Sequence, residues 1–296
     1  MNLLLAVGPR LTWDLVADVR QLFEYPFMVN ALRAGTIVAV TAALVGWYMV
    51  LRRQTFAGHT LALIGFPGAA GAVLVGLSAQ LGFFSFCIGG ALVIGAAPGS
   101  GRNRFSGESA IVGVVQAFAL SCGFLFVSLY RGNLNGINSL LFGTFLGVTV
   151  EQVWVLLAVS VVAVGVLGVI ARPLLFASVD PEVAAARGLE VRALSIGFLV
   201  LLGVAAAEAS QITGSLLIFA LLVLPAATAQ AVTARPALSV ALSVAAALAV
   251  TWLGIAVAYY SPYPIGFWVT SIAFALFVLA RAGAAVRARL TRAPLL

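Results

Sequence analysis

Long runs of apolar residues dominate the sequence. The clearest of them cover residues 37–51, 111–129, 153–170, 238–258 and 269–280. Most of these runs approach the roughly 20 residues that cross a hydrocarbon layer as a helix. The alternating pattern of a membrane barrel strand is absent, and open backbone polar groups are costly in lipid. The pattern therefore predicts an all-α, polytopic helical membrane protein.

The polar breaks between these runs predict an orientation. Arginines gather in five of the breaks, at residues 52–53, 102–104, 172–192, 235 and 281–292. Cytoplasmic loops of membrane proteins carry an excess of positive charge, so all five breaks are placed on the cytoplasmic side. The opposite loops are short or nearly uncharged. Counting spans between the breaks predicts about nine transmembrane helices, with eight to ten possible, the amino terminus outside and the carboxyl terminus inside.

Two segments keep the span count open. Residues 12–27 are amphipathic and suit the membrane interface, whereas residues 137–150 are short for a span and suit a re-entrant segment. The predicted organisation is an amphipathic N-terminal segment (1–26), a transmembrane domain (27–284) and a basic cytoplasmic tail (285–296). No cleavable signal peptide is expected, because Pro9 and Arg10 interrupt the short apolar start.

Composition and charge narrow the function. The chain is 63% hydrophobic and 8% charged, against about 25% charged residues in a soluble domain. Its net charge of +7 comes from arginine alone, which suits anionic lipid headgroups and does not require nucleic acid. A P-loop needs a lysine on the nucleotide phosphates, and this chain has none. If ATP drives the protein, another polypeptide binds that ATP.

One cytoplasmic break, residues 178–190, has the pattern of a short capped helix. Asp180 is an expected N-cap, Pro181 occupies the first helical position, and Gly188 is an expected stop. Glu182 and Arg187 add charge to this segment. A capped, polar helix between two spans suits a docking surface; a simple turn between helices is the alternative.

Small residues mark the stretch from residue 58 to residue 76, which contains five glycines and Pro67. Such residues let membrane helices approach closely. They also occur in broken helices that line a solute path. Both interpretations are open from the sequence.

Five segments, taken in order, resemble the permeases of zinc- and manganese-type ATP-binding-cassette importers. They are FMVNALRAG (27–35), VLRR (50–53), LLFGTFLG (140–147), DPEVAAARGL (180–189) and LLVLPAATA (221–229). Order and spacing fit that family from about residue 25 to residue 280.

The resemblance implies a permease subunit in the bacterial cytoplasmic membrane that translocates a divalent metal cation. Zinc is the first expectation, with manganese or iron as alternatives, and no stably bound cofactor is expected. The implied partners are cytoplasmic ATPase subunits that hydrolyse the ATP, an extracytoplasmic metal-binding protein and a second permease copy forming a homodimer. In this comparison Asp180, Pro181, Glu182, Arg187 and Gly188 belong to the helix that couples the permease to the ATPase.

The sequence departs from that family at the expected metal position. Such permeases typically carry an aspartate and, four residues later, a histidine on one face of the second span. The matching residues here are His59 and Leu63, so the only histidine of the chain replaces the carboxylate. An imidazole suits zinc, whereas manganese prefers oxygen ligands. His59 is predicted to line the metal pathway; a purely structural polar residue is the alternative.

Glu208 and Gln211 are the other candidates for the metal pathway. Ionisable residues within spans are costly and often mark a route for solute. The two residues are one turn apart and are predicted to form an outer vestibule that receives a cation. A solvated helix end is the alternative interpretation of Glu208.

A secondary transporter coupled to ions is the competing function. That class usually needs several buried carboxylates or an internal repeat. The sequence offers one buried acid and no evident repeat, so the importer permease is favoured.

Overall fold

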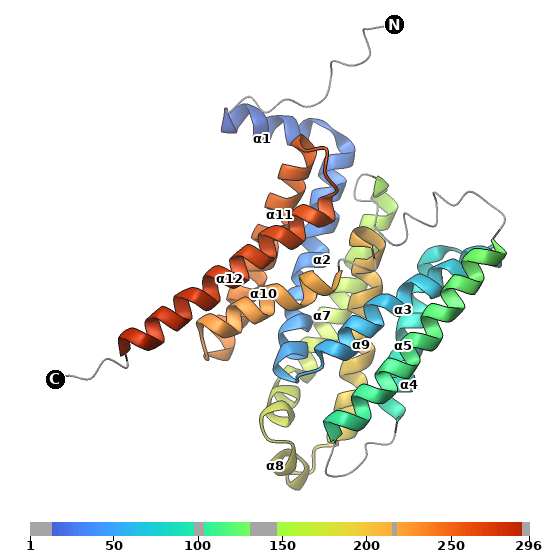
Figure 1. The fold of residues 1–296 in the computed structure, drawn as a ribbon, viewed down its shortest axis with the longest axis vertical. Helices are drawn as coiled ribbons and strands as arrows, with labels where there is room; N and C mark the ends of the chain where they lie inside the picture. Colours follow the sequence, from blue (N-terminus) through green and yellow to red (C-terminus); the bar gives the residue numbers. More distant parts are fainter. Residues whose placement is uncertain (1–13, 98–103, 131–146, 215–217, 292–296) are drawn as a thin grey trace, which may run out of the picture.

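The computed structural model describes residues 14–97, 104–130, 147–214 and 218–291, and these residues form helices without a strand (Figure 1). The helices are α1 (Leu15–Glu24), α2 (Pro26–Leu51), α3 (Thr55–Leu74), α4 (Ala79–Ala96), α5 (Arg104–Leu129), α7 (Val150–Val179), α8 (Pro181–Ala186), α9 (Val191–Thr213), α10 (Ile218–Val232), α11 (Pro236–Tyr260) and α12 (Ile265–Thr291). Within the described ranges, eight helices are long and apolar enough to cross a membrane, and α10 is a shorter apolar helix. The prediction of a polytopic all-α membrane protein is confirmed.

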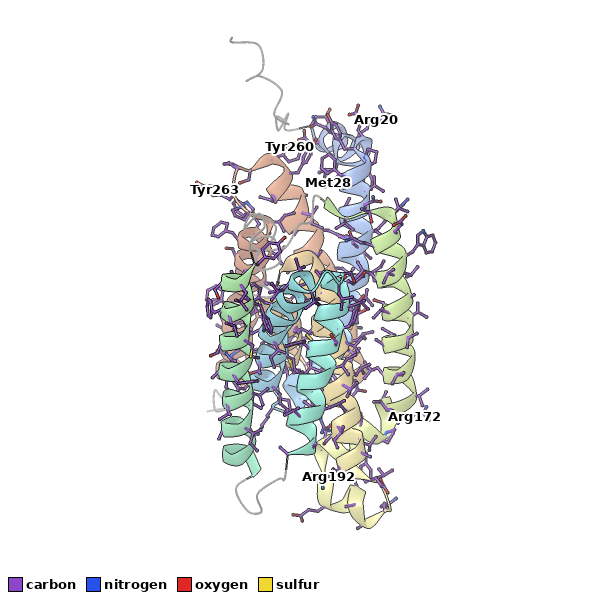
Figure 2. All side chains as sticks on the ribbon, turned by 90° about the vertical axis from the view of Figure 1, so that its right-hand side faces the viewer. Arg20, Met28, Arg172, Arg192, Tyr260 and Tyr263 are labelled. Carbon is purple, nitrogen blue, oxygen red and sulfur yellow. The ribbon has the colours of Figure 1, made fainter. Side chains whose placement is uncertain are left out.

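The arginine-rich breaks that the structure describes gather at one end of the bundle. In Figure 1 the α2–α3 turn, α8 and the carboxyl end of α12 lie toward the lower end, opposite α1 and the α11–α12 turn. Figure 2 shows Arg172 and Arg192 near that lower end, and Arg20, Tyr260 and Tyr263 near the other. This arrangement agrees with the single cytoplasmic side that the arginine pattern predicts.

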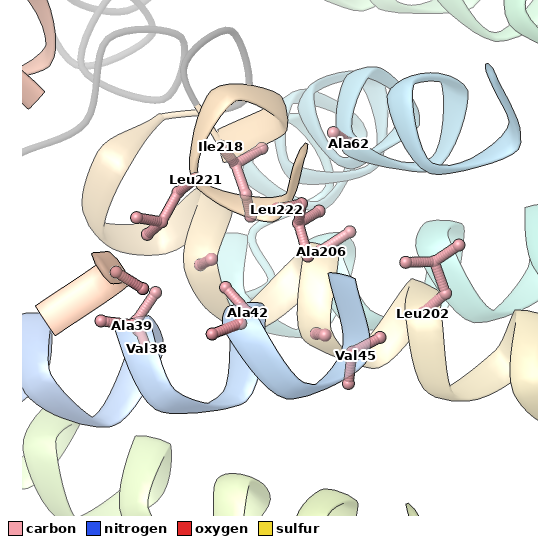
Figure 3. Packing of buried hydrophobic residues seen from close by; sticks show 14 of the residues in the cluster. Val38, Ala39, Ala42, Val45, Ala62, Leu202, Ala206, Ile218, Leu221 and Leu222 are labelled. Atoms are coloured by element: carbon pink, nitrogen blue, oxygen red, sulfur yellow. The ribbon is translucent and has the colours of Figure 1, made fainter. Parts of the chain in front are cut away.

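Helix α2 runs through the centre of the described bundle and packs against α7, α9, α10 and α11. Its buried face is made of small and branched residues, including Val38, Ala42 and Val45, which meet α9 and α10 in Figure 3. At Gly46 an added Cβ would lie 2.0 Å from the backbone oxygen of Leu222. Because this contact is to backbone, only glycine allows α2 and α10 to cross so closely.

The glycine-rich stretch forms a packing face on an unbroken helix. Helix α3 continues through Pro67. A Cβ at Gly68 would lie 2.3 Å from the carbonyl oxygen of Gly82, and a Cβ at Gly82 would lie 2.2 Å from that of Gly68. The two glycines therefore bring α3 and α4 into backbone contact. Of the two interpretations that the sequence left open, the structure supports close packing.

Apolar side chains cover the outer faces of several helices. Phe118 on α5 is 72% exposed, Val169 on α7 is 82% exposed and Leu279 on α12 is 70% exposed. Lipid is the solvent that accepts such surfaces.

The segments that kept the span count open have different outcomes. Helix α1 lies within the predicted amphipathic segment and is held against α11, because Tyr260 donates a hydrogen bond to the Asp18 carbonyl (2.9 Å). Most of the predicted re-entrant segment, residues 137–146, lies outside the described residues. The domain boundaries at residues 26 and 284 stay predictions.

Candidate translocation pathway and coupling surface

His59 lies in the second turn of α3, just after the α2–α3 turn. Arg53 adopts a positive φ of 57° in that turn, and the Gln54 backbone N–H donates to the Met49 carbonyl (3.0 Å). Gly58, four residues after Gln54, packs directly on the Met49 side chain of α2. The turn therefore fixes where α3 starts, and with it the position of His59 near the arginine-rich end.

The residues around His59 divide α3 into a covered and an uncovered side. Thr60 and Leu61 are fully buried, and Thr60 donates to the Gln116 side chain of α5 (2.7 Å). His59 and Leu63 are only half-buried, and Phe56 is 44% exposed. Since these three residues follow the helical spacing of one face, His59 belongs to a stripe that other helices of the same chain leave partly open.

Glu208 lies in the interior of the bundle, where α2, α7 and α9 meet. Its side chain is 1% exposed, and Oε1 is hydrogen-bonded to Ser160 Oγ. Ser160 Oγ is in turn 2.6 Å from Thr41 Oγ1. Oε2 is buried and has no hydrogen-bond partner. The interpretation of Glu208 as a solvated helix end does not fit this burial.

Gln211 is half-buried, and its side-chain amide donates to the Ala207 carbonyl of its own helix (3.2 Å). It makes no hydrogen bond with Glu208, and Glu208 makes none with His59. Among the described residues there is no group of three or more His, Cys, Asp or Glu side chains that could hold a metal. The structure thus does not bring the three pathway candidates together, and their pathway role stays a prediction.

The predicted capped helix is present as α8. Asp180 Oδ1 accepts the Val183 backbone N–H (3.0 Å), Pro181 begins the helix, and Gly188 has a positive φ of 83°. Glu182 and Arg187 are exposed, whereas Ala184 is fully buried. The local geometry agrees with the sequence pattern. Docking of a partner on this helix stays a prediction.

Arg52 joins the ends of the two helices that flank α8. Its guanidinium donates to Ser178 Oγ of α7 (3.0 Å) and Ser195 Oγ of α9 (2.6 Å). Nε donates to Gln54 (3.1 Å), and the group lies 5.4 Å from the ring centre of Phe198. Charge-assisted hydrogen bonds of this kind are the stronger ones. Arg52 therefore ties together the helix ends on either side of α8.

Sequence reasoning did not identify Ser160, Thr41 or Arg52 as functional candidates. A signal existed for Ser160, which is the one hydroxyl residue in the apolar run 153–170. Polar residues in such runs usually have partners inside the protein. Arg52 was read only as a marker of orientation.

A multi-span helical bundle with an exposed capped helix between two spans at its arginine-rich end is the architecture of a polytopic membrane protein, and the family match shows that its class is a transport permease. More particularly, it belongs to the ABC 3 transport family, whose family model matches residues 24–284. The match covers the whole bundle from the start of α2 into α12. Membership confirms the resemblance and the expected location as a multi-pass protein of the bacterial cytoplasmic membrane.

Two relatives and one solved structure define the similarity further. The chain is 28% identical over 212 residues to the manganese transport system membrane protein MntC of Listeria innocua, covering 72% of this chain and 74% of the relative. It is 32% identical over 215 residues to the chelated iron transport system membrane protein YfeC of Yersinia pestis, covering 73% and 72%. The fold is similar to that of PsaBC from Streptococcus pneumoniae, with a TM-score of 0.79, 23% identity and coverage of 90% of this chain and 94% of that chain.

Proposed function

We propose that this chain is the membrane permease of an ATP-binding-cassette importer that translocates a divalent metal cation. The family match over residues 24–284 carries the proposal. Relatives named for transport of manganese and of chelated iron support the substrate class. These names favour manganese or iron, while zinc rests on the imidazole of His59 alone.

ATP hydrolysis belongs to a separate subunit in this proposal. The chain has no lysine with which to build a P-loop. Helix α8 supplies a docking surface, since it projects at the arginine-rich end with most of its residues exposed. Its N-cap and the tight turn at Gly188 fix its direction relative to α7 and α9. A metal-binding protein on the opposite side completes the proposed complex.

A second permease copy forms the translocation route together with this chain. The argument is the partly open stripe of Phe56, His59 and Leu63 on α3. A half-buried imidazole on an incompletely covered helix face suits a route shared between two copies. One His59 from each copy would then flank the route near its inner end.

The decisive experiment is metal uptake into liposomes that contain the permease, its ATPase and its metal-binding protein. Uptake of manganese, iron and zinc is compared, and each value is divided by the amount of folded permease. His59→Ala is expected to lower normalised uptake at least tenfold while thermal stability changes little. His59→Asp is expected to keep part of the uptake and to shift preference toward manganese, because manganese prefers oxygen ligands.

Val73→Ala is the matched control, since Val73 is also half-buried on α3 but lies at its other end. It is expected to leave uptake unchanged. Normal normalised uptake by His59→Ala would remove His59 from the proposed route. Absence of ATP-dependent uptake of all three metals by the wild-type complex would contradict the substrate class itself.

A further inference from the structure

The hydrogen-bond chain at Glu208 contains more contacts than its hydroxyl groups can supply with hydrogens. Glu208 Oε1 meets Ser160 Oγ, Ser160 Oγ meets Thr41 Oγ1, and Thr41 Oγ1 reaches the Ile37 carbonyl (3.1 Å). Each hydroxyl has one hydrogen to donate, while a carbonyl and an ionised carboxylate only accept. Three contacts therefore need three hydrogens, and the two hydroxyls supply two.

Protonation of Glu208 completes the chain. The acid O–H then donates to Ser160, Ser160 donates to Thr41, and Thr41 donates to the Ile37 carbonyl. With an ionised Glu208 the direction of the first two bonds is reversed, and the contact of Thr41 with Ile37 has no hydrogen. In the protonated state Oε2 is also a neutral carbonyl oxygen. A buried carbonyl oxygen without a hydrogen-bond partner costs less free energy than a buried carboxylate oxygen without one.

The described residues around Glu208 supply no counter-charge. Glu208 forms no ion pair with any described residue, and α9 packs against α2, α3, α4, α7, α8 and α10. Titratable groups on α2 and α7 lie at least seven residues, or about 10 Å along the helix, from Thr41 and Ser160. Cys87 of α4 is engaged with the Leu61 carbonyl (3.2 Å), and the described part of α10 has no titratable residue. The titratable groups on these helices are Arg33 and Tyr48 on α2, Arg52 at its end, His59 on α3, Cys87 on α4, Glu151 and Arg172 on α7, and Glu182 on α8.

We propose that Glu208 holds a proton in this conformation, so that the junction of α2, α7 and α9 is a proton-binding site in the membrane interior. A lone charge there would be costly, and the hydrogen count independently favours the acid form. The side chain is 1% exposed. Its proton therefore exchanges with solvent only when the three helices separate, which links proton exchange to opening of the bundle.

Infrared spectroscopy of the full-length permease in lipid nanodiscs at neutral pH tests the proposal. The wild-type spectrum minus that of Glu208→Gln is expected to contain the C=O stretch of a carboxylic acid. Glu182→Gln is the matched control, because Glu182 is exposed on α8; its difference spectrum should contain a carboxylate band only. The acid band should also shift slowly after transfer to D₂O, since exchange requires opening.

A carboxylate band in place of the acid band for Glu208 would overturn the proposal. If Glu208→Gln does not fold, Ser160→Ala provides the second measurement. Loss of the serine oxygen removes the acceptor of the acid O–H, so the acid band is expected to move. An acid band that is absent from the wild type, or that does not move in Ser160→Ala, would also contradict the site.

Discussion

Arg52 and Glu208 connect the same three helices, α2, α7 and α9, but at different depths. Arg52 lies at the helix ends and donates hydrogen bonds to Gln54, Ser178 and Ser195. Glu208 lies about 16 Å deeper, judged from the eleven-position separation of Thr41 and Arg52, and has Ser160 as its hydrogen-bond partner. At the helix ends, the charge of Arg52 is stabilised by several hydrogen-bond partners and by solvent. In the interior, with one hydroxyl partner, the neutral form is favoured.

The comparison shows that one helix interface is held in two chemically distinct ways. The Arg52 contacts depend on a permanent charge. The Glu208 contacts depend on a proton. The three predictions below separate these two sets of contacts, from the largest expected effect on stability to the smallest.

Replacing Arg52 should have the largest effect on stability. Arg52→Ala removes the hydrogen bonds to Ser178 and Ser195, and hydrogen bonds to a charged group contribute roughly 1.5–3 kcal/mol each. We expect a marked fall in the unfolding temperature of the purified permease. Arg52→Lys should recover part of the loss, because a lysine keeps the charge but not the fork of donors. Arg172→Ala, at an exposed residue of α7, is the control and should change the unfolding temperature little.

Replacing Glu208 should separate hydrogen bonding from charge. Glu208→Ala leaves a space and removes the hydrogen bond to Ser160, which should cost about 1–3 kcal/mol. Glu208→Gln should cost less than about 1 kcal/mol, because its amide donates to Ser160 as the acid O–H does. Denaturant unfolding of both variants at neutral pH measures the difference. Equal destabilisation by Ala and Gln would mean that Ser160 needs a charged acceptor.

Replacing the exposed charges of α8 should leave stability almost unchanged. Glu182→Ala combined with Arg187→Ala is expected to alter the unfolding free energy by less than about 0.5 kcal/mol, as is usual for surface substitutions. Co-purification of the ATPase with the permease should fall several-fold, because these side chains lie on the proposed docking surface. Full co-purification and full ATP-dependent uptake would show that the ATPase binds elsewhere.

The features that the sequence predicts well are local. Long apolar runs predict helices because lipid allows few other structures, and α8 follows from Asp180, Pro181 and Gly188 because capping acts over a few residues. The positions of the arginines along the chain similarly predict which ends of the helices lie together.

The features that the sequence does not predict are long-range contacts. Arg52 is 126 residues from Ser178 and 143 from Ser195, and no local pattern joins them. Glu208 was expected near a vestibule because its place along α9 is close to the helix end. Its burial depends on how α2 and α7 pack over it, which is a property of tertiary structure. For the same reason the α3 glycines left two interpretations open.

The contact between Gly68 and Gly82 has a mechanical consequence for transport. Each glycine leaves no clearance for a Cβ against the backbone of the other helix, so we expect α3 and α4 to move together. His59 is near one end of α3, and the α3–α4 turn is at the other. A displacement that moves His59 is therefore expected to move the turn at Leu77 and Ser78 at the other end of α3 as well. A binder that immobilises that turn would be expected to arrest the inner end of the proposed route without touching it.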